Sequence, residues 1–430
     1  MLFTRLRLLA GLLSLVPMGV QAFAQAGVAQ QATAVPVTTL HQIAELTASD
    51  EQKLIYFGTA VAVSGNTVVV AAPGIVSTGN IIPGAVYVYV RPSTGWSNMT
   101  QVAKLTASDN NSSDGFGFSV AISGSTIVVG SNLREVFVFE EPAGGWTNMT
   151  ETAILTASPT GLGPCLCGQV VVNGDTIAVG SPQDSLGSLG SIEVYNKPAG
   201  GWQNASDPDA LLYEPFGIAQ GHSFQAIAMS DTGIVGSSHY FRNGAAQQVI
   251  EVFLKLPAGW TGNQGPQATL FSTRTDASFG SSEGSVAILG NTIVAGSLSP
   301  NFTNIPPSFV DVWVKPFSGW TSTTETAQLS DSSPNYQDGF GTSVAIAPIG
   351  ILVGTPAAFK VGQNIGGATY VFSKPVGGWQ TTSAPSQTLL NSDRTANDGF
   401  GSSVAADGST IVVGAPFGPH SSQSGRAYIY

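Results

Sequence analysis

Short runs of alternating apolar and polar residues recur from about residue 40 to the end of the chain, separated by Gly-containing turns. One unit shows the arrangement clearly. Phe116–Ile122 alternates small or polar with apolar residues, and the β-branched run Thr126–Gly130 follows after a Ser-Gly-Ser turn. Two such runs joined by a tight turn predict a hairpin. Val136–Phe139 and Ala153–Thr156 complete the unit, so we predict a four-stranded antiparallel meander.

A Pro-containing turn that ends in Gly-Trp marks the repeat. It occurs six times, at Trp96, Trp146, Trp202, Trp260, Trp320 and Trp379. The spacings of 50 to 60 residues suit a propeller blade of four short strands. We expect these tryptophans to fill space between blades, with stacking on sugars as the alternative reading.

The third strand of each unit carries an aromatic residue at one fixed place. The seven residues are Tyr89, Phe139, Tyr195, Phe253, Trp313, Phe372 and Tyr430. An isolated four-stranded sheet cannot cover both of its faces, so we expect these rings to be wedges between adjacent sheets.

The two ends of the repeat region complement each other. The region opens with a strand-four sequence, Ile43–Thr47, and stops after a strand-three sequence, Ala427–Tyr430. Pairing these segments would hide two sheet edges. With the degenerate copies at 167–172 and 223–228 included, we predict an all-β fold: a seven-bladed β-propeller of four-stranded antiparallel blades, with the ring closed by an N-terminal strand.

The N-terminus has the pattern of an export signal. Arg5 and Arg7 precede an apolar stretch from Leu8 to Val20, and the small residues Ala22 and Ala24 stand before the expected cleavage after Ala24. This pattern predicts a signal peptide over residues 1–24, a flexible leader over 25–40 and the propeller over 41–430. No later segment is long and apolar enough to span a membrane. We therefore expect a secreted, periplasmic or cell-surface protein.

Composition narrows the partner classes. Fifteen Lys and Arg residues stand against 26 acidic ones, which gives a net charge of −11, so no basic field attracts nucleic acid. Cys165 and Cys167 are the two cysteines. A disulfide between residues two apart in a strand would be strained, so we expect a packed or partly exposed thiol pair rather than a metal site.

Two short motifs resemble the FG-GAP repeats of the integrin alpha-chain propeller, in a bacterial-type secreted form. The FG element stands at Phe57-Gly58, Phe116-Gly117, Phe340-Gly341 and Phe400-Gly401, and the GAP element at Ala71-Ala72-Pro73, Gly354-Thr355-Pro356 and Gly414-Ala415-Pro416. The resemblance covers nearly all of residues 41–430. It implies a ring of seven blades in which strand one lines the central channel, with ligands bound by the loops that join strand four to one and strand two to three.

Calcium binding is not carried over from the family. The family binds calcium through an Asp- and Asn-rich loop between strands one and two, whereas turns such as Ser64-Gly65-Asn66 cannot supply six to eight oxygens. The four-to-one loops contain Asp109, Asp114, Asp331, Asp338, Asp393 and Asp398. We expect the second Asp of each pair to cap its own turn, with a metal ligand as the alternative. We therefore predict neither a metal nor another cofactor.

No catalytic motif stands out. His41, His222, His239 and His420 do not have the spacing of a metal site, and we expect no enzyme activity. The long two-to-three connections of units four to six provide the candidate ligand-binding residues: His239, Tyr240, Arg242, Asn243, Asn301, Phe302, Phe359 and Lys360. Aromatic, Arg and amide groups suit a protein or glycan ligand.

Three functions therefore compete. We expect a monomeric binding or adhesion propeller that contacts a protein or a surface. A carbohydrate-binding, lectin-like propeller is the alternative, and an enzyme acting on glycans is the third possibility.

Overall fold

The computed structural model describes residues 39–50, 56–73, 75–77, 80–109, 115–132, 135–156, 168–181, 190–213, 224–242, 245–274, 286–297, 308–331, 338–357, 359–360, 363–364, 366–393, 397–417 and 424–430. The chain divides into Met1–Thr39 and a compact unit, Leu40–Tyr430. The described residues form strands without helices. Within this described part, no helix has the length and apolar character that crossing a membrane requires.

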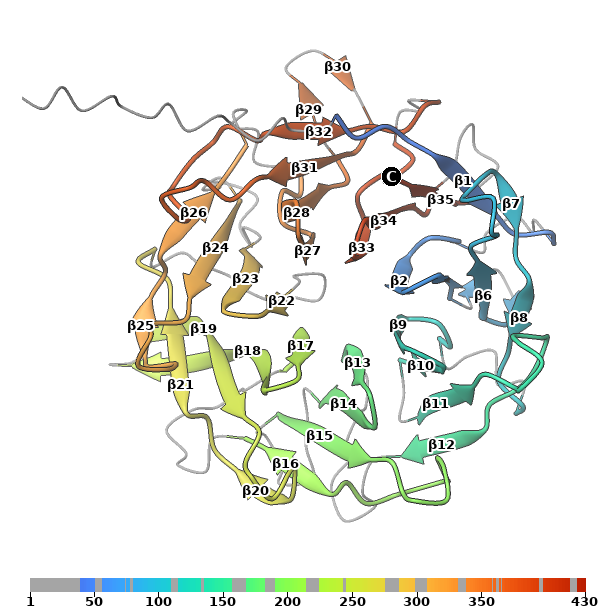
Figure 1. Cartoon of the computed structure of the whole chain (residues 1–430), viewed down its shortest axis with the longest axis horizontal. Coiled ribbons are helices and arrows are strands. Elements are labelled where there is room, and N and C mark those ends of the chain that lie inside the picture. The colour runs from blue at the N-terminus through green and yellow to red at the C-terminus, as the bar shows by residue number, and fades with distance from the viewer. Residues whose placement is uncertain are drawn as a thin grey trace, which may run out of the picture. The chain divides into compact units, whose positions relative to one another are not determined.

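The compact unit is a ring of seven antiparallel sheets, as predicted (Figure 1). The innermost strands are β2 (Ala60–Ser64), β9 (Ser119–Ser123), β13 (Val170–Asn173), β17 (Ile227–Ser230), β22 (Val286–Leu289), β27 (Ser343–Ala347) and β33 (Ser403–Asp407). The second strands are β3 (Thr67–Ala72), β10 (Thr126–Gly130), β14 (Thr176–Ser181), β18 (Gly233–Arg242), β23 (Thr292–Ser297), β28 (Gly350–Thr355) and β34 (Thr410–Ala415).

The third strands are β6 (Ala85–Val90), β11 (Glu135–Glu140), β15 (Ser191–Asn196), β19 (Ala245–Leu254), β24 (Phe309–Val314), β31 (Ala368–Phe372) and β35 (Arg426–Ile429). The fourth strands are β8 (Ala103–Leu105), β12 (Ala153–Thr156), β16 (Ala210–Leu212), β21 (Ala268–Phe271), β26 (Ala327–Leu329), β32 (Gln387–Leu389) and β1 (Ala44–Thr47). We number the blades one to seven in the order of their inner strands, so blade seven contains β33, β34, β35 and β1.

Strand boundaries in the second blade follow the sequence pattern closely, with small corrections. β10 and β12 have the predicted bounds, and β11 is one residue longer at each end than predicted. β9 begins at Ser119 rather than Phe116 and ends at Ser123 rather than Ile122. The FG residues before β9 form a turn in which Gly117 has a φ of 94°. A side chain is strained in that region of φ, so the FG glycine sets the turn.

The hairpins between strands one and two are as tight as predicted. In every blade, two residues separate the last pair of the ladder, such as Ser64↔Thr67 and Asp407↔Thr410. The first turn residue is usually glycine; Gly65 and Gly408 each have a φ of 56°. These turns therefore have no room for an extended ligand loop.

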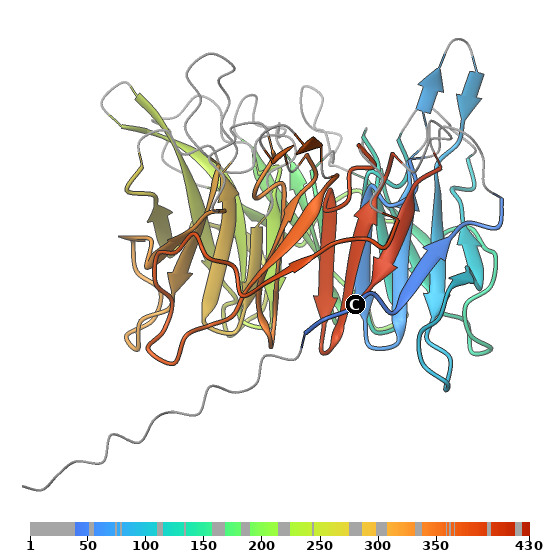
Figure 2. The ribbon, with the colours of Figure 1, turned by 90° about the horizontal axis from the view of Figure 1, so that it is seen from above.

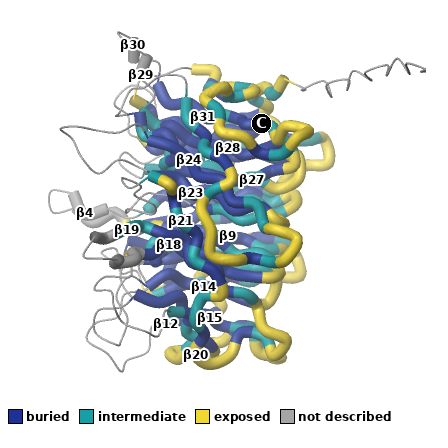
Figure 3. Tube along the Cα trace, turned by 90° about the vertical axis from the view of Figure 1, so that its left-hand side faces the viewer, coloured by how far each residue is buried: buried dark blue, intermediate teal, exposed yellow. Residues whose placement is uncertain are grey.

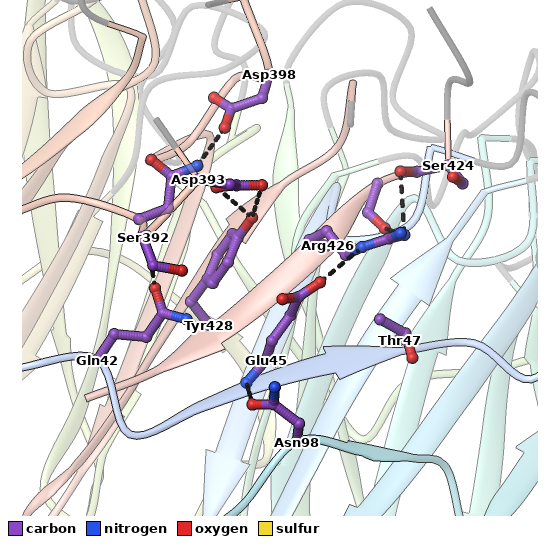
Figure 4. A network of polar contacts seen from close by, with 12 residues as sticks. Gln42, Glu45, Thr47, Asn98, Ser392, Asp393, Asp398, Ser424, Arg426 and Tyr428 are labelled. Carbon is purple, nitrogen blue, oxygen red and sulfur yellow. Dashed lines mark hydrogen bonds and ion pairs between the residues drawn. The ribbon is translucent and has the colours of Figure 1, made fainter. Parts of the chain in front are cut away.

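β1 lies beside β35 and completes the sheet of blade seven with Ala44↔Ile429, Glu45↔Tyr428 and Leu46↔Ala427 in antiparallel register. Figure 4 shows polar side chains along this seam, where Arg426 Nε lies 2.8 Å from Glu45 Oε1. Ala44 and Leu46 are buried, whereas Ile43 is 56% exposed, so the apolar side of this strand begins one residue later than its sequence pattern indicated.

Apolar clusters fill the spaces between blades. The described residues form seven such clusters, and each combines side chains of two neighbouring blades. The cluster around Tyr89 includes Val412 and Ile429, and so joins blades one and seven. All seven strand-three aromatics are at most 3% exposed, which confirms the predicted wedges.

The chain that follows each Gly-Trp turn reaches back to the preceding blade, and we call this contact the clasp. Short strands β7 (Met99–Thr100), β20 (Gly262–Gln264) and β25 (Thr323–Thr324) pair parallel with β1, β16 and β21. In blades two, three and six the clasp is a single parallel bridge to the fourth strand of the preceding blade: Leu105↔Met149, Leu155↔Ala205 and Leu329↔Thr382. The residue two after the tryptophan often adds a side-chain acceptor. For example, Lys104 N donates to Asn148 Oδ1 over 2.8 Å.

The antiparallel order gives the ring two unlike edges. Connections between strands one and two, and between strands three and four, lie on one edge, which we call the tight-turn edge. Connections between strands two and three, and between strands four and one, lie on the opposite edge, the loop edge (Figure 2). In Figure 3 the exposed turns gather along the tight-turn edge.

Candidate binding surface

The predicted ligand residues of blade four lie on a long hairpin rather than in a loop. β18 and β19 pair over ten positions, including His239↔Gln248, Tyr240↔Gln247 and Arg242↔Ala245. The predicted loop is therefore wrong for His239, Tyr240 and Arg242. The signal was present in the sequence, because the two residues between Arg242 and Ala245 are Asn-Gly, a dipeptide favoured in two-residue hairpins.

This hairpin extends beyond the body of its blade. The neighbouring strand β21 pairs with β19 only at Ile250, Glu251 and Val252. The outer half of the hairpin comprises Ser237–Arg242 and Ala245–Val249. β21 does not pair with this half, which rises on the loop edge (Figure 2). The base of the hairpin is held within the sheet, because β18 pairs with β17 from Gly233 to Gly236 and β19 pairs with β21 from Ile250 to Val252.

A second small hairpin carries Phe359 and Lys360. β29 (Phe359–Lys360) pairs with β30 (Gln363–Asn364) in the two-to-three connection of blade six. A third hairpin, β4 (Ile75–Ser77) with β5 (Asn80–Ile82), occupies the same connection of blade one, and sequence reasoning missed it. Its signal was two β-branched runs around Thr-Gly. Asn243, Asn301 and Phe302 lie outside the described residues, as do Cys165, Cys167 and Asp114.

Two of the loop-edge aspartates cap their own turns, as expected. Phe340 N donates to Asp338 Oδ1 over 3.0 Å, and Phe400 N donates to Asp398 Oδ1 over 2.9 Å. Both carboxyl groups are buried, with exposures of 3% and 1%. Burial, and then the negative charge of Asp331, raise the pKa of Asp338 to about 8. Burial also raises the pKa of Asp398.

One position on strand three divides the blades into two groups. In blades one, two, six and seven it holds an aromatic ring next to the FG phenylalanine, as in the pair Phe116–Phe137 with centroids 5.1 Å apart. In blades three, four and five it holds Glu193, Glu251 or Asp311. The three central blades therefore replace an aromatic contact with a buried carboxyl group.

These three carboxyl groups do not point into one common site. Tyr195 donates its hydroxyl hydrogen to Glu193 Oε2 over 2.8 Å, and Gln328 Nε2 donates to Asp311 Oδ1 over 2.9 Å. Burial raises the pKa of Asp311 to about 7. Each group lies in a different blade interface, so they do not share one pocket. Among the described residues no three His, Cys, Asp or Glu side chains are placed to hold a metal ion.

The six Gly-Trp tryptophans are buried, with exposures between 2% and 9%. That burial favours the space-filling reading over stacking on sugars. A hollow of about 240 Å³ lies next to the blade-six turn. The residues that line it include Ser373, Trp379, Gln380, Thr381, Thr382 and Ser386. This hollow is on the opposite edge from β18–β19.

The repeats also match a known family. FG-GAP repeats are found at residues 40–89, 99–136, 323–372 and 385–430. In these four ranges the chain is similar to the FG-GAP repeat family. The matched ranges cover most of blades one, two, six and seven, which keep the FG phenylalanine and its aromatic partner. Of blades three to five they include only β25 and β26, and Glu193, Glu251 and Asp311 lie outside them. The FG-GAP propeller fold suggests a protein-interaction module. A comparison with curated proteins gives no match to this chain.

One solved structure supports the fold, and the fold alone. A chain from the crystal structure of the mitotic checkpoint complex is similar, with a TM-score of 0.51 and 14% identity over 98% of each chain. The computationally designed Ika8 protein is similar over 91% of this chain and 100% of its own, with a TM-score of 0.44 and 14% identity.

Proposed function

We propose that this protein is a secreted, non-catalytic propeller that binds a protein or a surface ligand through its loop edge. The observation that carries the proposal is the β18–β19 hairpin, which projects beyond β21 and bears His239, Tyr240 and Arg242. The smaller hairpin with Phe359 and Lys360 stands on the same edge. Tyr and Arg residues often dominate binding energy at protein interfaces.

The rest of the ring supplies a rigid base for these hairpins. The inter-blade clusters and the wedge aromatics are buried, so substitutions at the hairpin tips are expected to change binding without unfolding the ring. Export is proposed from the N-terminal pattern of Arg5, Arg7 and the following apolar stretch.

The test is a pull-down from the native extracellular fraction, run beside a glycan array. Replacing Tyr240, Arg242 and Phe359 with Ala should reduce capture of the ligand by at least about tenfold, which corresponds to 1.4 kcal/mol. The melting temperature should stay nearly unchanged. Thr147→Ala, on the tight-turn edge, is the control. Unchanged capture by the triple variant would contradict the proposal.

A carbohydrate ligand is the second candidate, and the hollow beside Trp379 is the observation that favours it. A glycan bound there would be lost after Gln380→Ala and Thr382→Ala and would survive the changes on β18 and β29. The two variant sets therefore separate the two candidates.

A further inference from the structure

Three consecutive blades present an exposed apolar side chain in the turn between strands three and four, at its tip in blades five and six and one position earlier in blade four. Phe317 is 111% exposed and Val376 is 99% exposed, so these side chains pack against nothing else in the described chain, and Leu256 is 44% exposed. They belong to blades five, six and four. A single exposed apolar residue needs no explanation, but fully exposed tips on adjacent, equivalent turns indicate a contact surface.

The turns that carry these residues are held in place. Gly319 N donates to Pro316 O over 3.0 Å, Gly378 N donates to Pro375 O over 3.0 Å, and Gly259 N donates to Leu256 O over 2.8 Å. A buried tryptophan follows each glycine at the base of the turn. The apolar tips are therefore fixed in the exposed position rather than left there by a loose loop.

Each of the three turns also begins with a lysine. Lys255 and Lys374 are exposed, Lys315 is partly exposed, and none of them forms an ion pair with another described residue. Two acids lie close to the blade-four turn: Asp231, next to Thr232, whose carbonyl accepts a hydrogen bond from Lys255 N, and Asp209, whose carbonyl accepts one from Gly262 N. In blades five and six, the turn from the lysine to the tryptophan combines that lysine with an apolar tip and contains no acidic residue.

The other half of the same edge differs at the equivalent positions. The residue three before the tryptophan is Ser93, Ala143 or Ala199 in blades one to three, where blades five and six have Phe317 and Val376. Blade two begins its turn with Glu140 and Glu141, and Lys197 of blade three is paired with Glu140. The apolar tips Phe317 and Val376 are therefore not a property of the repeat itself, whereas a cation at the start of the turn also occurs as Arg91 and Lys197 in blades one and three. We call the surface formed by Leu256, Phe317, Val376, Lys255, Lys315 and Lys374 the sector.

We propose that this sector docks on an anionic phospholipid surface. The three apolar tips enter the interface between headgroups and acyl chains, and the lysines remain at the level of the phosphates. Shallow insertion of aromatic and aliphatic side chains together with attraction between lysines and anionic lipids is the usual combination for reversible membrane association. A fluid surface accepts three separate convex tips, whereas a folded protein would need a matching pocket for each.

The test is co-sedimentation with vesicles of phosphatidylcholine containing phosphatidylglycerol, compared with vesicles of phosphatidylcholine alone. The chain should bind the anionic vesicles more tightly, and added salt should weaken binding. The double variants Phe317→Ser with Val376→Ser, and Lys315→Glu with Lys374→Glu, should each lose at least about tenfold in affinity. All variants keep the same N-terminus, so any contribution of residues 1–38 cancels.

The matched control places the same kind of change in the other half of the edge. Ala143→Ser with Ala199→Ser should leave vesicle binding unchanged, and circular dichroism should show that every variant is folded. Equal vesicle binding by all variants, or no binding of the unaltered chain to anionic vesicles, would overturn the proposal. So would capture of an acidic protein through these residues without vesicle binding. The proposal concerns the opposite edge from β18–β19, so its failure leaves the ligand-binding proposal intact.

Discussion

Asp338 and Asp398 occupy the same place in neighbouring blades, and only their partners differ. Asn391 Nδ2 donates to Asp398 Oδ2, whereas Asp338 forms its hydrogen bond with another carboxyl group, that of Asp331. The sequence predicted the capping role of these aspartates from the Asp-Gly-Phe-Gly motif. It could not predict the acid pair, because only the fold brings residues 331 and 338 together inside a blade interface.

This difference predicts a pH dependence for blade six. The folded-state pKa of Asp338, about 8, lies above its value of 3.8 in the unfolded chain. Its stabilising contribution is therefore complete below about pH 4 and is lost as the pH rises through about 8. Asp338→Asn keeps an acceptor for Phe340 N and removes the titration. The free energy of unfolding of this variant should exceed that of the unaltered chain by about 1–3 kcal/mol at pH 8, with a smaller advantage at pH 5.

The neighbouring blade provides the matched control. Asn391→Asp turns the Asn–Asp pair of blade seven into an acid pair, so that variant should become less stable as the pH rises from 5 to 8. Urea unfolding at both pH values measures the two effects. An advantage of Asp338→Asn that does not change with pH would show that the buried pair does not titrate in this range.

Among the elements, most strands follow directly from the sequence, and the exceptions have physical reasons. The sequence predicted β10 from its β-branched run after a Gly-containing turn, and β12 from the alternation of Ala153–Thr156, which agrees with its burial. The start of β9 was wrong, since backbone φ at Gly117 ends the extended conformation. The β18–β19 extension was read as a loop because its length depends on pairing between two distant runs rather than on either run alone.

The clasps are an element-level feature that the Gly-Trp motif did not reveal. Asn98, Asn148 and Asn204 accept hydrogen bonds from the backbone N–H groups of Glu45, Lys104 and Ile154 in the preceding blades. These contacts link residues about 50 positions apart, so local propensity carries no sign of them. The asparagine two residues after the tryptophan was the available signal.

Removing one clasp should weaken the ring slightly. Asn148→Ala deprives Lys104 N of its partner, and we expect a loss of about 0.5–1.5 kcal/mol in the free energy of unfolding, because water can partly replace an exposed acceptor. Asn148→Asp keeps the acceptor and should preserve stability, as should Thr147→Ala next to it. Urea denaturation of the three variants gives the comparison. If Asn148→Ala behaved like Thr147→Ala, the side-chain clasp would contribute nothing.

At the scale of the whole molecule, repetition made the architecture predictable. Six Gly-Trp turns and seven strand-three aromatics gave the blade number, and the complementary end segments indicated which strands pair. The specialised hairpins were less predictable, because two-to-three connections vary in length without changing the ring. The sequence therefore predicted the scaffold better than the surface. It missed the apolar sector at Phe317 and Val376, because the Gly-Trp motif was recognised by its Pro, Gly and Trp residues and not by the variable residue at the tip of the turn.

The central claim is that the N-terminal strand β1 closes the ring as the outer strand of blade seven. It buries Leu46, worth roughly 1.5–3 kcal/mol, and its ladder bonds contribute roughly 0.5–1.5 kcal/mol each. Glu45 also pairs with Arg426. A domain is typically stable by only about 5–15 kcal/mol, so losing this strand should remove a large part of the total.

The most direct measurement compares two truncations by melting temperature and sedimentation. Deleting residues 41–50 should lower the melting temperature by several degrees and produce oligomers through the uncovered edge of β35. Deleting residues 25–39 should leave a monomer that melts like the unaltered chain. If both truncated chains stayed monomeric and equally stable, the ring would not depend on β1 for its closure.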